Sequence, residues 1–156
     1  MNSLETQKWQ LRDYIKLIPA IMFASLIFYL SSLPSPVPPE AAEAVKVFDI
    51  NTLLHIAEYA VLTFLIAFGL FSKTKNYYII FIGIGYAFSD ELHQYFVPNR
   101  YFDILDVMAD GIGVIIGLIG YIIFLTLISQ IKNMLDVQEE KEVILKEKEN
   151  DNKEKG

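Results

Sequence analysis

A run of 23 residues without a charged side chain, from Leu17 to Pro39, most constrains what this chain folds into. Three further stretches later in the chain are nearly as apolar. A helix needs about 20 mostly apolar residues to cross roughly 30 Å of hydrocarbon. We therefore predict an all-α polytopic membrane protein, a bundle of four transmembrane helices at residues 15–33, 52–71, 77–96 and 104–129.

The composition excludes several classes of protein. Hydrophobic residues make up 53% of the 156 and charged residues only 21%, which is too apolar for a disordered chain. The net charge of -6, with only two arginines, argues against nucleic-acid binding, because a phosphate backbone needs clustered Lys and Arg. The chain has no Cys, which excludes disulfides, a thiolate nucleophile and Cys-ligated zinc. The partner expected from this composition is the lipid bilayer.

The first apolar stretch has a rival interpretation as a cleavable secretory signal peptide. Its apolar run is long, and it is followed by Ser31-Ser32-Leu33-Pro34 instead of a clean small-residue cleavage site. We therefore expect an uncleaved span. The proline-rich stretch after it is expected to be extended, and residues 40–48 to form a short amphipathic turn at the outer interface.

Lys and Arg are distributed very unevenly between the segments that flank these spans. With the N-terminus inside, the inner segments contain eleven of them and the outer loops only Lys46 and Arg100. Because cytoplasmic loops carry the excess of Lys and Arg, we predict a cell-membrane protein with both termini cytoplasmic. The predicted organisation is a cytoplasmic or interfacial segment at residues 1–14, a membrane domain at 15–131, and a charged cytoplasmic tail at 132–156 that frays by Asn150.

Ionisable residues interrupt three of the four spans, always at the predicted outer end. At 1.5 Å per residue, His55 lies roughly 24 Å from Phe71 and Asp90 roughly 20 Å from Tyr77, so both fall inside a 30 Å layer. A charge at such depth costs at least ~2.5 to 3.5 kcal/mol, so these residues normally face a bundle interior or a wet cavity. We expect them to line one outward-facing polar pocket.

Helical spacing defines the candidate binding residues of this pocket. Residues three and four apart share a helix face, and beneath the acids Gly113 and Gly117 form a small-xxx-small motif that lets another helix approach closely. Asp103 is expected to be a helix N-cap. The candidate binding residues are His55, Glu58, Tyr59, Ser89, Asp90, Glu91, His93, Gln94, Arg100, Asp106 and Asp110.

The charges of the predicted pocket do not balance, since Arg100 is the only fixed cation near its carboxylates. The remaining acids must protonate, take charge from the two histidines, or bind a cation. A divalent cation is one alternative, and its identity stays open because no His-Glu-x-x-His signature is present. We expect Arg100 to form a bidentate pair with one of Asp90, Glu91 or Asp106.

These residues resemble the VanZ family of small bacterial membrane proteins over roughly residues 30–117. The segments that carry the resemblance are Ser31-Ser32-x-Pro34, His55-x-x-Glu58-Tyr59, Ser89-Asp90-Glu91-x-His93-Gln94-x-Phe96-Val97-Pro98-x-Arg100 and Asp106-x-x-x-Asp110-x-x-Gly113-x-x-x-Gly117. Where many members have Asp-Lys ahead of the histidine, this chain has Asn51-Thr52. The resemblance implies a role in the bacterial cell envelope and, in the member that names the family, reduced teicoplanin susceptibility, without an agreed reaction.

Three functions fit these features. The preferred one is an envelope protein whose pocket binds a polar or cationic envelope component, with a link to glycopeptide susceptibility and with cell-wall or lipid-linked precursors as partners. The second is a membrane-embedded acid–base or metal-dependent enzyme acting on a lipid-linked precursor, with Glu58, Asp90 or Glu91 as general acid or base beside His55. The third is a cation- or proton-coupled transporter. Turnover by the purified protein separates the first from the second.

Overall fold

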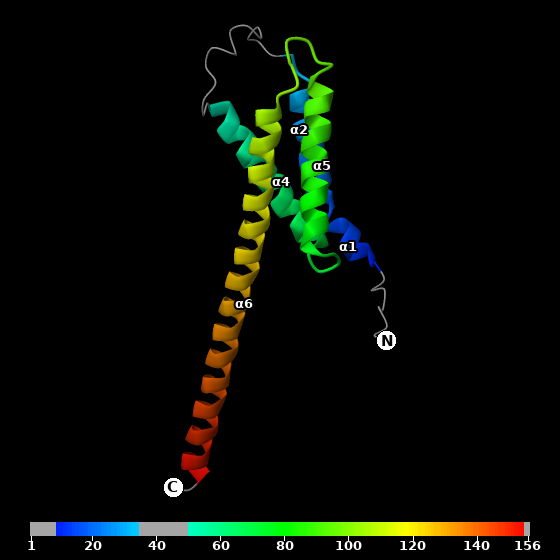
Figure 1. The fold of residues 1–156 in the computed structure, drawn as a ribbon. Coiled ribbons are helices and arrows are strands. Elements are labelled where there is room, and N and C mark those ends of the chain that lie inside the picture. Colours follow the sequence, from blue (N-terminus) through cyan, green and yellow to red (C-terminus); the bar gives the residue numbers. More distant parts are fainter. Residues whose placement is uncertain (1–8, 35–49, 155–156) are drawn as a thin grey trace, which may run out of the picture. The chain divides into compact units, whose positions relative to one another are not determined.

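The computed structural model describes residues 9–34 and 50–154, and all the regular secondary structure in these ranges is helical (Figure 1). The all-α class is therefore confirmed. The expected amphipathic turn at residues 40–48 and most of the proline-rich stretch before it lie outside the described residues. The helices are α1 (Leu11–Ile15), α2 (Ile18–Ser31), α4 (Ile50–Leu70), α5 (Asn76–Gln94) and α6 (Ile104–Glu154).

Three helical stretches of the described chain are long and apolar enough to cross a membrane: Leu11–Ser31, Asn51–Leu70 and Ile104–Lys146. The third predicted span, which corresponds to α5, is not among them. Its first residues are Asn76, Tyr77 and Tyr78, and its last turns contain the polar run from Ser89 to Gln94. These polar ends lower the mean hydropathy of a helix whose middle is apolar.

The first predicted span is divided between α1 and α2, because the helix is interrupted at Lys16 and Leu17. Pro19 lies in the first turn of α2, where its missing N–H removes no intrahelical hydrogen bond. The carboxylate of Asp13 holds α1 in place. It accepts a hydrogen bond from the Gln10 backbone N–H at 2.9 Å and lies 3.0 Å from the Lys73 ammonium. This contact attaches α1 to the turn between α4 and α5.

The chain divides into two compact units, Met1–Tyr121 and Ile122–Gly156. In the first unit, α4 and α5 are joined by the short turn of residues 71–75 and pack side by side, as the sequence predicts. The beginning of α6 packs on α4 through its glycines. A side chain at Gly113 would overlap the carbonyl oxygen of Ile56, and one at Gly117 would overlap that of Ala60. The small-xxx-small motif therefore sets a close helix contact beneath the acids.

The second unit is the continuation of α6. The predicted last span ends at Ser129, yet the helix continues through Glu154. No Gly or Pro occurs between Gly120 and Glu154, and Glu and Lys, which are good helix formers, are frequent in this part. Among the side chains described here, all are exposed except that of the half-buried Leu125. A solvated helical tail was expected, and it extends past Asn150, where we predicted fraying.

Candidate functional site

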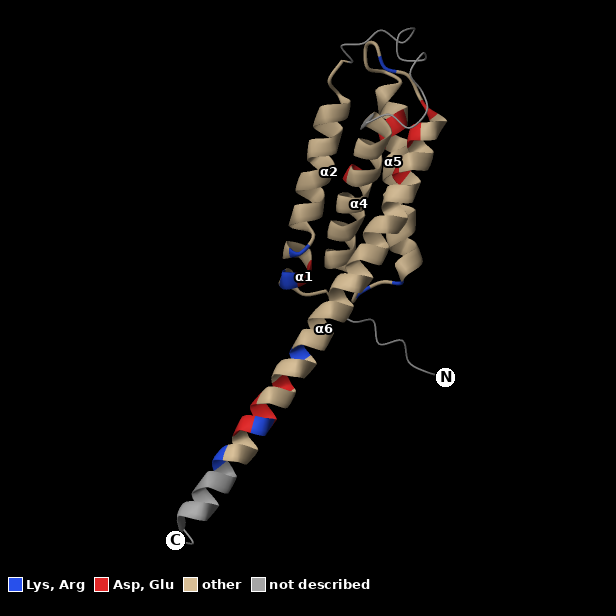
Figure 2. Cartoon of the chain, turned by 90° about the vertical axis from the view of Figure 1, so that its left-hand side faces the viewer, with Lys and Arg blue, Asp and Glu red and all other residues tan. Residues whose placement is uncertain are grey.

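Apart from Asp13 on α1, the acidic residues described in the first unit gather at the end where α5 leads into α6 (Figure 2). α4, α5 and α6 each contribute to this group, so the structure brings together the outer ends of three predicted spans. Several of these polar side chains are almost completely withdrawn from the surface. The buried members are His55, Asp90, Glu91, Gln94, Asp103 and Asp110.

His55 lies at the centre of one half of this polar network. Its Nδ1 is 3.0 Å from Oδ1 of Asp110, and its Nε2 is 4.0 Å from Oδ2 of Asp106. An ionised carboxylate only accepts hydrogen bonds, so Nδ1 donates to Asp110. The contact to Asp106 is too long for a hydrogen bond. Asp110 thus fixes the orientation of the ring and leaves Nε2 facing Asp106.

Glu91 joins α5 to the beginning of α6. Its side chain is fully buried, and Oε2 accepts a hydrogen bond from the Asp103 backbone N–H at 3.0 Å. The other oxygen, Oε1, has no hydrogen-bond partner in the part of the chain that is described. Asp103 in turn accepts a hydrogen bond from the Leu105 N–H at 2.9 Å, which is the N-cap role expected from its position.

The second half of the network surrounds Asp90. Its Oδ2 accepts hydrogen bonds from the Ser31 hydroxyl at 2.9 Å and from the Gln94 amide at 3.2 Å, while Oδ1 is buried without a partner among the described residues. Ser31 belongs to the last turn of α2, so all four long helices contribute to this end of the unit. Ser31 was not among the predicted binding residues, although it is part of the VanZ-like segment.

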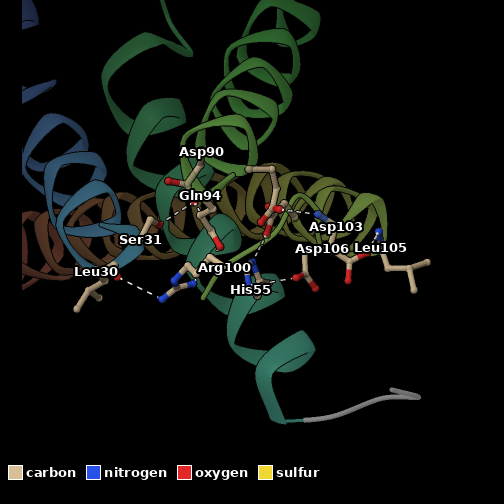
Figure 3. A network of polar contacts seen from close by, with 11 residues as sticks. Leu30, Ser31, His55, Asp90, Gln94, Arg100, Asp103, Leu105 and Asp106 are labelled. Carbon is tan, nitrogen blue, oxygen red and sulfur yellow. Dashed lines mark hydrogen bonds and ion pairs between the residues drawn. The ribbon is translucent and has the colours of Figure 1, made fainter. Parts of the chain in front are cut away.

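The predicted pairing of Arg100 with a carboxylate is wrong for the described residues. The guanidinium donates to the carbonyl oxygen of Leu33 at 3.0 Å. It also donates to the carbonyl oxygen of Leu30 at 3.4 Å and to Oε1 of Gln94 at 2.9 Å (Figure 3). These carbonyls lie at and just after the C-terminal end of α2, where the helix dipole attracts a cation, and that of Leu30 also accepts the Leu33 N–H at 3.1 Å. Arg100 therefore caps α2 and reaches Asp90 only through Gln94.

The remaining predicted site residues occupy different surroundings. His93 contacts the Ser32 hydroxyl through Nε2 at 3.0 Å and stacks on Phe28, with ring centroids 4.5 Å apart, so it is tied to α2. Ser89 is exposed and donates to the backbone carbonyl of Tyr86. The structure therefore does not bring Ser89 into the network.

Two candidates on α4 lie one helical turn below His55. Tyr59 is fully buried, and its hydroxyl has no hydrogen-bond partner among the residues the structure describes. Glu58 is half-buried and lies within Coulombic range of His55, Asp90 and Arg100. Glu58 thus lies near charged groups of both halves of the network.

An apolar cavity of about 220 Å³ is separate from these groups. It contains none of the predicted binding residues and lies between α2, α4 and α5, with a lining that includes Leu17, Ala24, Ile66 and Tyr86. The candidate functional site is therefore the polar network and not this apolar cavity.

The network provides carboxylate oxygens and one imidazole. An imidazole held by a buried aspartate is the arrangement that acid–base catalysts use to fix a tautomer. One ligand atom each from His55, Glu91 and Asp106 also lie within 4.8 Å of one another, close enough to surround a metal ion. These groups therefore suit cation binding, metal binding and proton transfer.

Comparison with known proteins adds a family assignment. The family model described as VanZ/LLP1 matches residues 2–125, which include α1, α2, α4, α5 and the beginning of α6. No match was found among curated proteins or among solved structures.

Proposed function

We propose the following function for this chain, which belongs to the VanZ/LLP1 family. It is an integral membrane protein of the bacterial cell envelope, with four spans and both termini cytoplasmic. The polar network at the outer ends of α4, α5 and α6 forms a pocket that binds the cationic group of an envelope component.

The four-span topology is supported by the pairing of α5 with α4. α5 has 19 residues, which at 1.5 Å per residue extend about 28 Å, nearly the thickness of the hydrocarbon core. A helix joined to a span by a five-residue turn and packed along it must return across the same layer. Adding α5 to the three more apolar helices gives four spans.

The orientation is supported by charges at the two ends of the first unit. Lys and Arg lie on α1 and on the turn between α4 and α5, at the end opposite to the clustered acids (Figure 2). The Asp13–Lys73 contact shows that α1 and this turn are neighbours. Since Lys and Arg favour the cytoplasmic side, the acid-rich end faces outward.

The observation that carries the binding function is a set of buried carboxylate oxygens without donors. Oδ1 of Asp90, Oε1 of Glu91 and Oδ2 of Asp110 are all buried and have no hydrogen-bond partner among the described residues. Arg100 donates to carbonyl and amide oxygens instead. Buried polar atoms without partners are costly, so a ligand that brings N–H donors and positive charge fits this site.

Native mass spectrometry of the detergent-purified chain tests this binding. We use phosphatidylethanolamine, which has an ammonium group, and phosphatidylglycerol, which has none. The chain should retain phosphatidylethanolamine at least tenfold more strongly, and Asp90→Asn should lose this preference. Ser89→Ala, which alters an exposed hydroxyl on the same helix, is the control and should keep it. Equal retention of both lipids, or an unchanged preference in Asp90→Asn, would refute ammonium recognition.

A growth assay tests the physiological side of the proposal. The VanZ resemblance implies a link to glycopeptide susceptibility. We therefore expect expression of this chain in a susceptible Gram-positive host to raise the inhibitory concentration of teicoplanin, and Asp90→Asn to abolish the effect at equal membrane abundance. An equal inhibitory concentration of teicoplanin with and without the chain would show that this family member does not confer glycopeptide resistance.

The His55–Asp110 contact favours a second candidate function, acid–base catalysis on a lipid-linked envelope precursor. The buried aspartate holds the imidazole with Nε2 directed to the carboxylate of Asp106. Purified protein incubated with lipid-linked cell-wall precursors would then form a product that Glu58→Gln and Asp90→Asn abolish. If wild type leaves the precursors unchanged, the enzyme is excluded for those substrates.

A further inference from the structure

We propose that His55, Glu91 and Asp106 form a binding site for a divalent transition-metal ion of the Zn²⁺ or Mn²⁺ type. The ion would connect α4, α5 and α6 at their outer ends. This inference goes beyond recognition of an envelope component, and it requires no organic ligand.

The three residues present their ligand atoms to a common point from three helices. All three atoms lie within 4.8 Å of one another, and Nε2 of His55 is 4.0 Å from Oδ2 of Asp106. Ligands at about 2.0–2.2 Å from Zn²⁺ stand roughly 3.3–3.6 Å apart in tetrahedral geometry. A small approach of the side chains is therefore sufficient to enclose an ion.

His55 is oriented as a metal ligand is. Metal-bound histidines almost always donate their second ring N–H to a carboxylate or a carbonyl, which fixes the tautomer and aims the other nitrogen at the ion. Asp110 supplies this carboxylate at 3.0 Å from Nδ1. In the neutral ring with its proton on Nδ1, the other nitrogen, Nε2, carries the lone pair that a metal ion needs, and it faces Asp106.

Glu91 gives independent support. Its carboxylate is fully buried, yet Oε1 has no hydrogen-bond partner among the described residues. Within the described ranges, Oε2 accepts the Asp103 backbone N–H. A buried carboxylate normally has its oxygens paired or bound to a metal, and this one lies beside His55 and Asp106. A metal ion bound at this point would supply the partner that Oε1 of Glu91 lacks among the described residues.

The ligand types decide which metal fits. One imidazole nitrogen with two carboxylates matches Zn²⁺ and Mn²⁺, whereas Mg²⁺ and Ca²⁺ prefer oxygen ligands alone. Three protein ligands also leave a coordination position open, as in catalytic zinc sites. An ion here would therefore hold one further oxygen ligand from water or from a bound envelope component.

The test measures metal binding directly. Purified chain is stripped with a chelator, dialysed against Zn²⁺, Mn²⁺ or Mg²⁺, and assayed for bound metal by elemental mass spectrometry and for its melting temperature. We expect one Zn²⁺ or Mn²⁺ per chain, a higher melting temperature with either ion, and no effect of Mg²⁺ at the same concentration.

Conservative variants locate the ion. Glu91→Gln and Asp106→Asn keep the side-chain shape and should each weaken binding at least tenfold, and Asp110→Asn should weaken it 10- to 100-fold through the orientation of His55. Ser89→Ala, which alters an exposed hydroxyl on the helix that carries Glu91, is the control and should bind like wild type. The melting temperature of each metal-free variant shows whether it is folded.

Two outcomes would overturn the proposal. One is a wild-type chain that binds no Zn²⁺ or Mn²⁺ at micromolar concentration, which would leave His55 as the ion-pair partner of two aspartates. The other is unchanged binding in Glu91→Gln and Asp106→Asn, which would place the metal elsewhere. Neither outcome affects the lipid-retention measurement, so the two proposals fail separately.

Discussion

His55 on α4 and Asp110 on α6 are joined by a 3.0 Å contact between Nδ1 and Oδ1, and Asp110 has no exposed surface. The next residue of α4, Ile56, directs its carbonyl oxygen at the place where Gly113 has no side chain. The polar contact and the close backbone contact are therefore adjacent on the same two helices. Anything that separates α4 from α6 will also move His55 away from Asp110.

Substitution of Gly117 tests this close packing. An added methyl group would overlap the Ala60 carbonyl, so Gly117→Ala should lower the free energy of unfolding by about 1–3 kcal/mol through overpacking. Thermal unfolding of the purified chain in detergent provides the measurement. The control is Gly111→Ala, where a side chain meets nothing within 4 Å and the higher helix propensity of Ala should be neutral or stabilising. Equal melting temperatures for both variants would contradict the packing contact.

Arg100→Lys tests the cap on α2. A lysine is a single point charge and cannot contact the carbonyls of Leu30 and Leu33 and the amide of Gln94 together. We expect a loss of about 1–3 kcal/mol in the free energy of unfolding, on the scale of the hydrogen bonds removed. The control is Arg12→Lys, at an exposed position, which should leave the free energy of unfolding unchanged. A wild-type melting temperature for Arg100→Lys would show that charge alone is sufficient.

The contact between Asp13 and Lys73 should contribute to stability at the other end of the unit. Lys73→Met removes the ammonium partner of a carboxylate whose other contact among the described residues is the Gln10 N–H, so the melting temperature should fall. Lys75→Met removes an exposed ammonium from the same turn and should have less effect. Adding Asp13→Asn to Lys73→Met removes the unpaired carboxylate and should restore part of the lost stability. If the double variant is no more stable than Lys73→Met alone, the unpaired carboxylate is not the cause of the lower melting temperature.

Topology is testable with single cysteines, since the chain has none of its own. In intact cells, a membrane-impermeant thiol reagent should label Pro98→Cys, in the loop between α5 and α6, and should leave Lys75→Cys unlabelled until the membrane is permeabilised. Asn99 is left unchanged because its φ of 60° is a strained conformation for Cys. The reverse labelling pattern would invert the orientation.

The sequence predicted the features that depend on local spacing. Apolar length located the helices, and i, i+3 and i+4 spacing placed the acids and the glycines on shared faces. The break at Lys16 and Leu17 was missed because it lies within an apolar run. The extension of α6 beyond Ser129 was missed because only the apolar stretch was counted, although the absence of Gly and Pro indicated it.

The partners of individual side chains were harder to predict. Arg100 was expected beside an acid because side-chain charges are visible in a sequence, whereas backbone carbonyls at the end of α2 that can accept from a guanidinium are not. Ser31 is 59 residues from Asp90, and only the packing of α2 on α5 brings them together. Ser89 was placed in the pocket by its neighbours in the chain, but the helix turns it to the exposed side.

The most direct test of an outward-facing polar pocket is the reactivity of Glu58→Cys in intact cells. Glu58 is half-buried and lies within Coulombic range of both halves of the network. If this network lines a water-filled pocket open to the outside, a small, charged thiol reagent will modify this cysteine without permeabilisation, more slowly than Pro98→Cys. No modification under conditions that fully label Pro98→Cys, or modification only after permeabilisation, would contradict the account.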